Sequence, residues 1–228
     1  PTQVRLIPMQ DAVPVERVAC PLCGAARSKA FFQDRRRDYR RCAECRLVFV
    51  PPAHHVSAER EKAEYDLHKN SPEDPGYRRF LSRLFEPIQG KLEPGSFGLD
   101  FGCGPGPTLS VMFEEAGYRM AIYDAFYVPD DHVFSERYDF ITATEVAEHL
   151  HRPGFDLERL WECLKPGGCL GLMTKQVRSR EAFGGWHYKN DITHVCFFSR
   201  EAFEWLANRW GARLEFHGED VILLTKPG

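Results

Sequence analysis

The chain has 228 residues, of which 43% are hydrophobic and 28% are charged, and its formal net charge is −3 at pH 7. This composition predicts one folded core with a small accessory module and excludes a disordered chain. No apolar run approaches the roughly 18 residues that a membrane span needs. The first eleven residues also lack the basic-then-apolar pattern of a signal peptide. We therefore expect a cytoplasmic protein that does not cross a membrane.

Charge is distributed unevenly along the chain. Residues 1–50 contain ten Lys and Arg against five Asp and Glu, a net of +5, which leaves a net of −8 for residues 51–228. The basic excess is concentrated in a cluster of five arginines, Arg35, Arg36, Arg37, Arg40 and Arg41. Two interpretations stay open: a solvated face of a small module, or a contact surface for phosphate. The acidic remainder argues against a protein that coats nucleic acid through bulk charge.

Four of the eight cysteines form two CxxC pairs separated by 18 residues. They are Cys20, Cys23, Cys42 and Cys45. Two such pairs at this separation predict a zinc site, and four thiolates close its tetrahedral shell, so the site would be structural. The metal would supply folding energy that so short a segment lacks. Two disulfides are the alternative, which the missing secretion signal disfavours.

The first part of the chain predicts a zinc-ribbon-like module followed by helices. Short strands are expected around Phe31–Phe32, at Tyr39 and over 47–50, and Pro51–Pro52 end the module. Ser57 is expected to cap a helix that runs from Ala58 to about His68, and a second helix follows over 77–88. We therefore divide the chain into a zinc-binding module (1–52), a helical lid or linker (53–95) and a third region (96–228).

From residue 97 onward, strands alternate with helices. Strands are expected over 97–101, 120–123, 138–144 and 169–174, and helices over 107–116, 156–164 and 199–210. A closing hairpin is expected from 213–216 and 221–224. Strands that alternate with helices indicate an α/β fold with a parallel sheet covered on both faces.

A glycine-rich loop, Gly102-Cys-Gly104-Pro-Gly106, follows the first strand of that sheet. Doubly wound sheets bind ligands at this place, because glycines allow a sharp turn and a close approach to the backbone. The spacing differs from the dinucleotide fingerprint. Asp100 just before the loop suits a ligand with a cationic or hydroxyl group. Asp124 at the end of the next strand could accept hydrogen bonds from both ribose hydroxyls.

Three segments in this order resemble the motifs of class I S-adenosylmethionine (SAM)-dependent methyltransferases. They are the glycine loop, residues 138–150 and the Leu164-Lys-Pro-Gly-Gly168 turn. The resemblance implies a Rossmann-like, seven-stranded α/β sheet with an antiparallel last strand, and SAM as the cofactor. The segment 130–134 departs from the family, which usually has a clearer third strand there.

The resemblance also implies a cofactor site, residue by residue. Gly102, Gly104 and Gly106 would line the amino-acid end of SAM, with Asp100 near its ammonium group. Asp124 would hold the ribose, and Ala125 would flank the adenine. Thr144 and Glu145 would border the site.

The acceptor is less defined than the cofactor. The N-terminal CxxC module is similar to one found in some deoxysugar C-methyltransferases, and to one in a ribosomal-RNA guanine methyltransferase. Residues 186–199 resemble a segment of many bacterial small-molecule methyltransferases that faces the active site. His149 and His194 are the expected catalytic residues, because a histidine near its ordinary pKa can remove the acceptor's proton.

Three functions follow from these observations. We expect methyl transfer from SAM to a small-molecule acceptor, with a structural zinc ion. The first alternative is an RNA methyltransferase that docks through the basic module. The second is a non-catalytic module that binds SAM.

Overall fold

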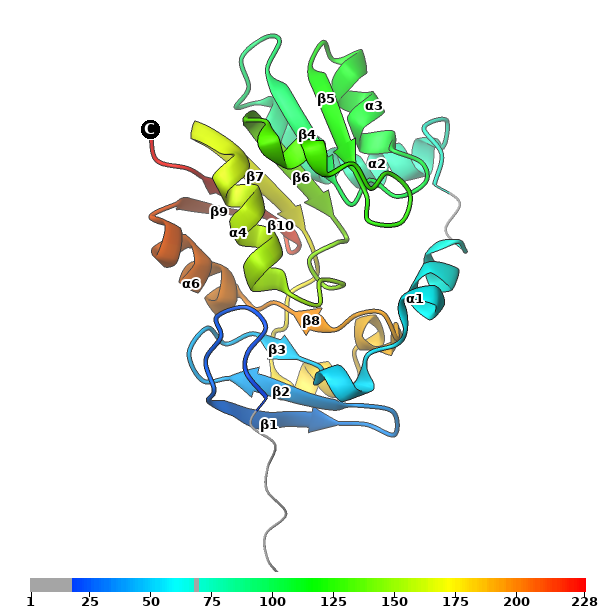
Figure 1. Ribbon diagram of the computed structural model, residues 1–228, viewed down its shortest axis with the longest axis vertical. Coiled ribbons are helices and arrows are strands. Elements are labelled where there is room, and N and C mark those ends of the chain that lie inside the picture. Colours follow the sequence, from blue (N-terminus) through cyan, green and yellow to red (C-terminus); the bar gives the residue numbers. More distant parts are fainter. Residues whose placement is uncertain (1–17, 68–69) are drawn as a thin grey trace, which may run out of the picture.

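Two β-sheets organise the chain in the computed structural model, which describes residues 18–67 and 70–228 (Figure 1). The expectations that concern the first eleven residues and His68 lie outside the described residues. The larger sheet has the strand order β5-β4-β6-β7-β10-β9. Its strands are β5 (Arg119–Tyr123), β4 (Phe97–Phe101), β6 (Tyr138–Thr144), β7 (Leu164–Met173), β10 (Val221–Thr225) and β9 (Arg213–His217). The first four are parallel, and β10 is antiparallel to both neighbours.

Helices cover both faces of this sheet, as the sequence predicts. One face packs against α2 (Pro75–Gln89) and α3 (Thr108–Glu115), and the other against α4 (Pro153–Cys163) and α6 (Arg200–Trp210). Alternate residues of the strands serve the two cores. On β10, for example, Val221 and Leu223 face the first pair of helices, whereas Ile222 and Leu224 face the second pair. None of the helices in residues 18–67 and 70–228 is long and apolar enough to cross a membrane.

The number of strands differs from the expected seven. In the described residues the larger sheet has six strands, and the segment that departs from the family's usual third strand forms the 3-10 helix η2 (Asp131–Ser135). The carboxylate of Asp130 accepts a hydrogen bond from the backbone N–H of His132, which starts this helical turn. Only Val133 is buried in it, so the segment lacks the alternation that a sheet strand needs.

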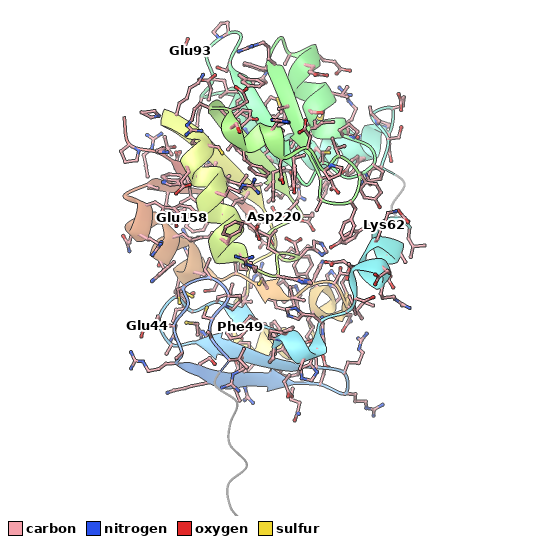
Figure 2. All side chains as sticks on the ribbon, in the orientation of Figure 1. Glu44, Phe49, Lys62, Glu93, Glu158 and Asp220 are labelled. Atoms are coloured by element: carbon pink, nitrogen blue, oxygen red, sulfur yellow. The ribbon has the colours of Figure 1, made fainter. Side chains whose placement is uncertain are left out.

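The smaller sheet joins the N-terminal module to a distant part of the chain. Its strands are β1 (Ser28–Gln33), β2 (Asp38–Cys42), β3 (Val48–Phe49) and β8 (Cys196–Phe197), all antiparallel. Phe49, labelled in Figure 2, pairs with Cys196. The short helix α5 (Arg180–Gly184) adds Phe183, whose ring packs against aromatic rings of β1, β2 and β8. The division of the chain at residues 52 and 95 stays a prediction.

The segment between the two sheets is helical. It contains the 3-10 helix η1 (Pro52–His54) and the helix α1 (Ala58–Tyr65). The hydroxyl of Ser57 accepts a hydrogen bond from the backbone N–H of Arg60, so the predicted cap is confirmed. The helix ends three residues before the expected His68.

The arginine cluster is largely bound within the molecule. Arg37 is buried, and its guanidinium donates hydrogen bonds to four backbone carbonyls of the segment 189–194, those of Lys189, Asp191, Ile192 and His194. Arg36, Arg40 and Arg41 bond to Asn190, Ser28 and Glu201, respectively. Arg36 and Arg37 therefore fasten the small sheet to the segment that carries His194.

We expect Arg37→Met to lower the free energy of unfolding by about 3 kcal/mol, because four carbonyls that face the guanidinium lose their donor. For a chain of this size that is a fall in Tm of roughly 6–12 °C. Arg35→Met is the matched control, since Arg35 is exposed. A thermal melt in which the two variants behave alike would show that the Arg37 contacts contribute little.

Candidate active site

A cavity of about 770 Å³ lies at the carboxyl ends of the parallel strands. Its walls come from the loops after β4, β5 and β6, from α1 and α2, and from the segment 187–194. Figure 2 shows side chains projecting into the space between this edge of the sheet and α1, on which Lys62 is labelled. Eight of the residues predicted from the sequence line this one cavity: Gly102, Gly104, Asp124, Ala125, Thr144, Glu145, His149 and His194.

The glycine loop is tied to the end of β5. The backbone N–H groups of Gly102 and Cys103 both donate to the carbonyl of Tyr123, at 2.7 and 3.1 Å. Gly102 has φ +76°, and a Cβ atom there would lie 2.3 Å from the Val146 side chain. Only glycine meets both conditions without strain.

Asp124 is held rigidly beside the loop. Its Oδ2 accepts a hydrogen bond from the backbone N–H of Gly104 at 3.0 Å. Its Oδ1 accepts from the N–H groups of Phe126 and Tyr127, at 2.9 and 3.1 Å. The carboxylate therefore has a fixed orientation at the cavity wall before any ligand binds.

Two predicted cofactor residues do not line the cavity. Asp100 is buried, and the hydroxyl of Thr142 donates to its Oδ1 at 2.8 Å. Burial raises the pKa of Asp100 to about 6. Gly106 packs against the backbone of Asn70, since a Cβ atom there would lie 2.3 Å from the Asn70 carbonyl oxygen. Both residues support the loop from outside the cavity.

The two predicted histidines lie next to each other at the other end of the cavity. The ring centroids of His149 and His194 are 4.6 Å apart. The backbone causes this meeting, because the carbonyl of Glu148 accepts hydrogen bonds from the N–H groups of Val195 and Cys196, at 2.8 and 2.9 Å. These bonds hold His149 and His194 side by side, although they are 45 positions apart in the sequence.

Hydrogen bonds determine which nitrogen of His149 carries the proton. Thr193 has one hydroxyl proton, which it donates to Asp191 Oδ1 at 2.6 Å. The contact of 3.0 Å between Thr193 Oγ1 and His149 Nδ1 therefore has the imidazole as donor. His149 Nε2 is left with an unprotonated lone pair.

His194 is in the same state. Its Nδ1 lies 2.7 Å from the carbonyl oxygen of Tyr188, which can only accept, so Nδ1 carries the proton. Burial lowers the pKa of His149 to about 3 and that of His194 to about 4. Both imidazoles are therefore neutral at pH 7 and each keeps a lone pair on Nε2. The expectation of histidines near their ordinary pKa is wrong for both, and each is a weaker base than a free histidine.

Sequence reasoning did not identify the buried carboxyl beside these histidines. Glu148 is 0% exposed, and the hydroxyl of Tyr188 donates to its Oε1. Burial, together with the nearby Glu145, raises the pKa of Glu148 to about 8, and burial raises that of Glu145 to about 7. The available signal was the pattern Glu-x-x-Glu-His directly after β6, at the edge where ligands bind.

The four cysteines of the CxxC pairs also meet. Their Sγ atoms all lie within 4.8 Å of one another, and the Cys20–Cys45 and Cys23–Cys42 pairs are 3.5 Å apart. Zinc–sulfur bonds of about 2.3 Å place tetrahedral ligands about 3.8 Å apart. The four thiols are therefore arranged as a zinc shell requires.

A family model described as a methyltransferase domain matches residues 73–215, more than half of the chain. The chain belongs to this methyltransferase family. The sequence resemblance to SAM-dependent methyltransferases is thus confirmed at the level of the family. No curated protein matches this chain in sequence.

Several solved structures are similar to this chain in fold. The PH0226 protein from Pyrococcus horikoshii is 14% identical, with a TM-score of 0.51 over 73% of this chain and 99% of that one. Burkholderia thailandensis 1,6-didemethyltoxoflavin-N1-methyltransferase, solved with 1,6-didemethyltoxoflavin and S-adenosylhomocysteine, is 14% identical (TM-score 0.49, 82% and 98% of the two chains). An uncharacterised methyltransferase from Bacillus halodurans is 20% identical (TM-score 0.44, 60% and 70%). At these identities the likeness concerns the fold of the methyltransferase alone.

Proposed function

We propose that the protein transfers a methyl group from SAM to a small-molecule acceptor. The observation that carries the proposal is that the glycine loop, Asp124 and the pair His149–His194 line one cavity. That cavity, of about 770 Å³, is within the size range of ligand sites in proteins. Family membership supports the reaction type.

Each residue predicted for the cofactor has a place in this proposal. Gly102 and Gly104 accommodate the amino-acid end of SAM, while Asp100 and Gly106 hold the loop in shape from behind. Asp124 accepts hydrogen bonds from the ribose hydroxyls. Three further residues complete the pocket: Ala125 at the adenine, and Thr144 and Glu145 toward the acceptor.

SAM supplies a methyl group that is already activated by its sulfonium. In the transfer, a lone pair of the acceptor forms the new bond to the methyl carbon, while the carbon–sulfur bond breaks and its electron pair stays on sulfur. The acceptor atom gives up a proton, which an Nε2 lone pair of the histidine pair can accept during the transfer and pass to water. His149 and His194 are neutral, unprotonated at Nε2 and located at the acceptor end, and we assign to them the activation of the acceptor.

We further propose that the four clustered cysteines hold a structural zinc ion. All four coordination positions are filled by thiolates, so the ion would not bind substrate. Its role is mechanical, since the small sheet that it stabilises includes β8 and is bonded to the segment that carries His194.

A docking surface for RNA receives little support from the arginine cluster, since Arg36, Arg37, Arg40 and Arg41 are engaged by partners within the chain. An acceptor of that kind remains one outcome of the test.

A transfer assay tests the proposal. The purified protein is incubated with SAM that carries a radiolabelled methyl group and with fractionated cell extract. We expect the label in a small-molecule fraction. Label in an RNase-sensitive fraction would overturn the acceptor class, and SAM binding without transfer in any fraction would identify a non-catalytic module.

A further inference from the structure

We propose that Glu148, His149 and His194 form a second metal site, for a divalent first-row cation, at the acceptor end of the cavity. The inference deepens the proposed function and rests on it, because the ion would bind the acceptor. One ligand atom from each of the three residues lies within 4.8 Å of the other two. Metal–ligand bonds of about 2.0–2.2 Å require ligand atoms about 3–4 Å apart, so small side-chain rotations would close the site.

Glu148 provides the first independent argument. Its side chain is completely buried, and Tyr188 holds one carboxyl oxygen, Oε1. The other oxygen, Oε2, is buried and has no hydrogen-bond partner in the described residues. A buried oxygen of this kind is costly unless a donor or a cation compensates it. A metal ion between Glu148 and the two imidazoles would supply that compensation.

The hydrogen bonds of the histidines provide the second argument. Each imidazole donates its Nδ1–H to a fixed oxygen, from His149 to Thr193 Oγ1 and from His194 to the carbonyl of Tyr188. Histidines that bind metals almost always donate their other ring N–H to a carboxylate, a carbonyl or a similar acceptor, which orients the ring. Asp191, behind Thr193, completes such a chain for His149.

The surroundings of the site are rich in carboxyl groups. Four carboxyl groups surround it: Glu148 itself, and Glu61, Glu145 and Asp191 in the cavity wall. Oε1 of Glu145 is a second buried carboxyl oxygen that lacks a partner. Two basic side chains lie nearby: Lys175, which contacts His187 in the cavity wall, and Arg37, which donates a hydrogen bond to the backbone carbonyl of His194.

The donor set indicates which ion and which acceptor would bind. Two imidazoles and one carboxylate suit Mn²⁺, Fe²⁺, Co²⁺ or Zn²⁺, and three protein ligands leave coordination positions open. An acceptor oxygen can fill an open position, and the ion then lowers the pKa of that hydroxyl so that its proton passes to water. The acceptor class is therefore a compound that presents a hydroxyl oxygen. His149 and His194 would act by holding the ion.

Binding of Mn²⁺ to the full-length protein tests the site, because Mn²⁺ prefers oxygen and nitrogen ligands and competes poorly for the four cysteines. Titration followed by electron paramagnetic resonance is expected to show one bound Mn²⁺ per chain. Glu148→Gln and His194→Gln should each weaken binding at least about 10-fold. His187→Gln is the matched control, since His187 lines the same cavity outside the ligand cluster.

SAM binding, measured on the same samples by calorimetry, separates the possible failures. A wild-type protein that binds SAM but not Mn²⁺, and is also unchanged by Co²⁺, overturns the metal site and leaves the proposed function standing. A wild-type protein that does not bind SAM would instead count against the proposed function. If Glu148→Gln fails to fold, His194→Gln and His149→Gln still decide the matter.

Discussion

Asp124→Ala is expected to weaken SAM binding at least about 100-fold. A hydrogen bond to a charged group contributes about 1.5–3 kcal/mol, and the ribose hydroxyls would lose their charged acceptor. The substitution also removes the acceptor for the N–H of Gly104, so the glycine loop loses the contact that fixes it beside β5. Isothermal titration calorimetry with SAM measures the change directly.

Two controls make this result interpretable. Asp124→Asn retains an oxygen for the N–H groups of Phe126 and Tyr127 but loses the charge, so its affinity should lie between those of the wild type and the alanine variant. Asp130→Ala changes an exposed carboxylate in the next loop and should leave SAM affinity unchanged. Equal affinity of the Asp124→Ala variant and the wild type would refute our placement of the ribose.

Cys42→Ser is expected to abolish stoichiometric zinc and to unfold the small sheet. Elemental analysis of the wild type should give about one zinc per chain. Structural zinc contributes about 10–16 kcal/mol to folding in small zinc modules. Because β8 and the segment 189–194 are bonded to the small sheet, we expect methyl transfer to fall with it, even though the cysteines lie outside the cavity.

The matched control for that variant is Cys163→Ser. Cys163 is also buried but lies on α4, away from the cysteine cluster. It should keep the zinc content at one per chain and lose only a modest amount of stability. A metal-free wild-type protein with a native melting transition would contradict the zinc proposal.

The sequence predicts the larger sheet well because local patterns determine it. The strands 97–101 and 138–144 occur at the expected residues. Ser57 caps its helix as predicted, and the helix expected over 199–210 forms at Arg200–Trp210. The glycine loop and Asp124 could be predicted equally well, since strand–loop–helix order alone places them at one edge of the sheet.

The remaining features depend on contacts between distant residues. A strand of two residues is too short to show an alternating pattern, so the pairing of Val48 with Phe197 cannot be predicted from the local sequence. The arginine cluster is visible in the sequence, but the partners of Arg37 are backbone carbonyls about 150 positions away. Glu148 was overlooked for the same reason, because its burial is created by Tyr188 and the segment after it.

The pairing between β3 and β8 has a consequence for how the chain folds during synthesis. The ribosome synthesises residues 28–49 about 150 residues before the strand that completes their sheet, at 196–197. Until then the edge of β3 is unpaired, and exposed strand edges promote aggregation. Early zinc binding would hold β1, β2 and β3 together through this interval. We therefore expect zinc-starved cells to accumulate the nascent protein as aggregates rather than as an inactive soluble form.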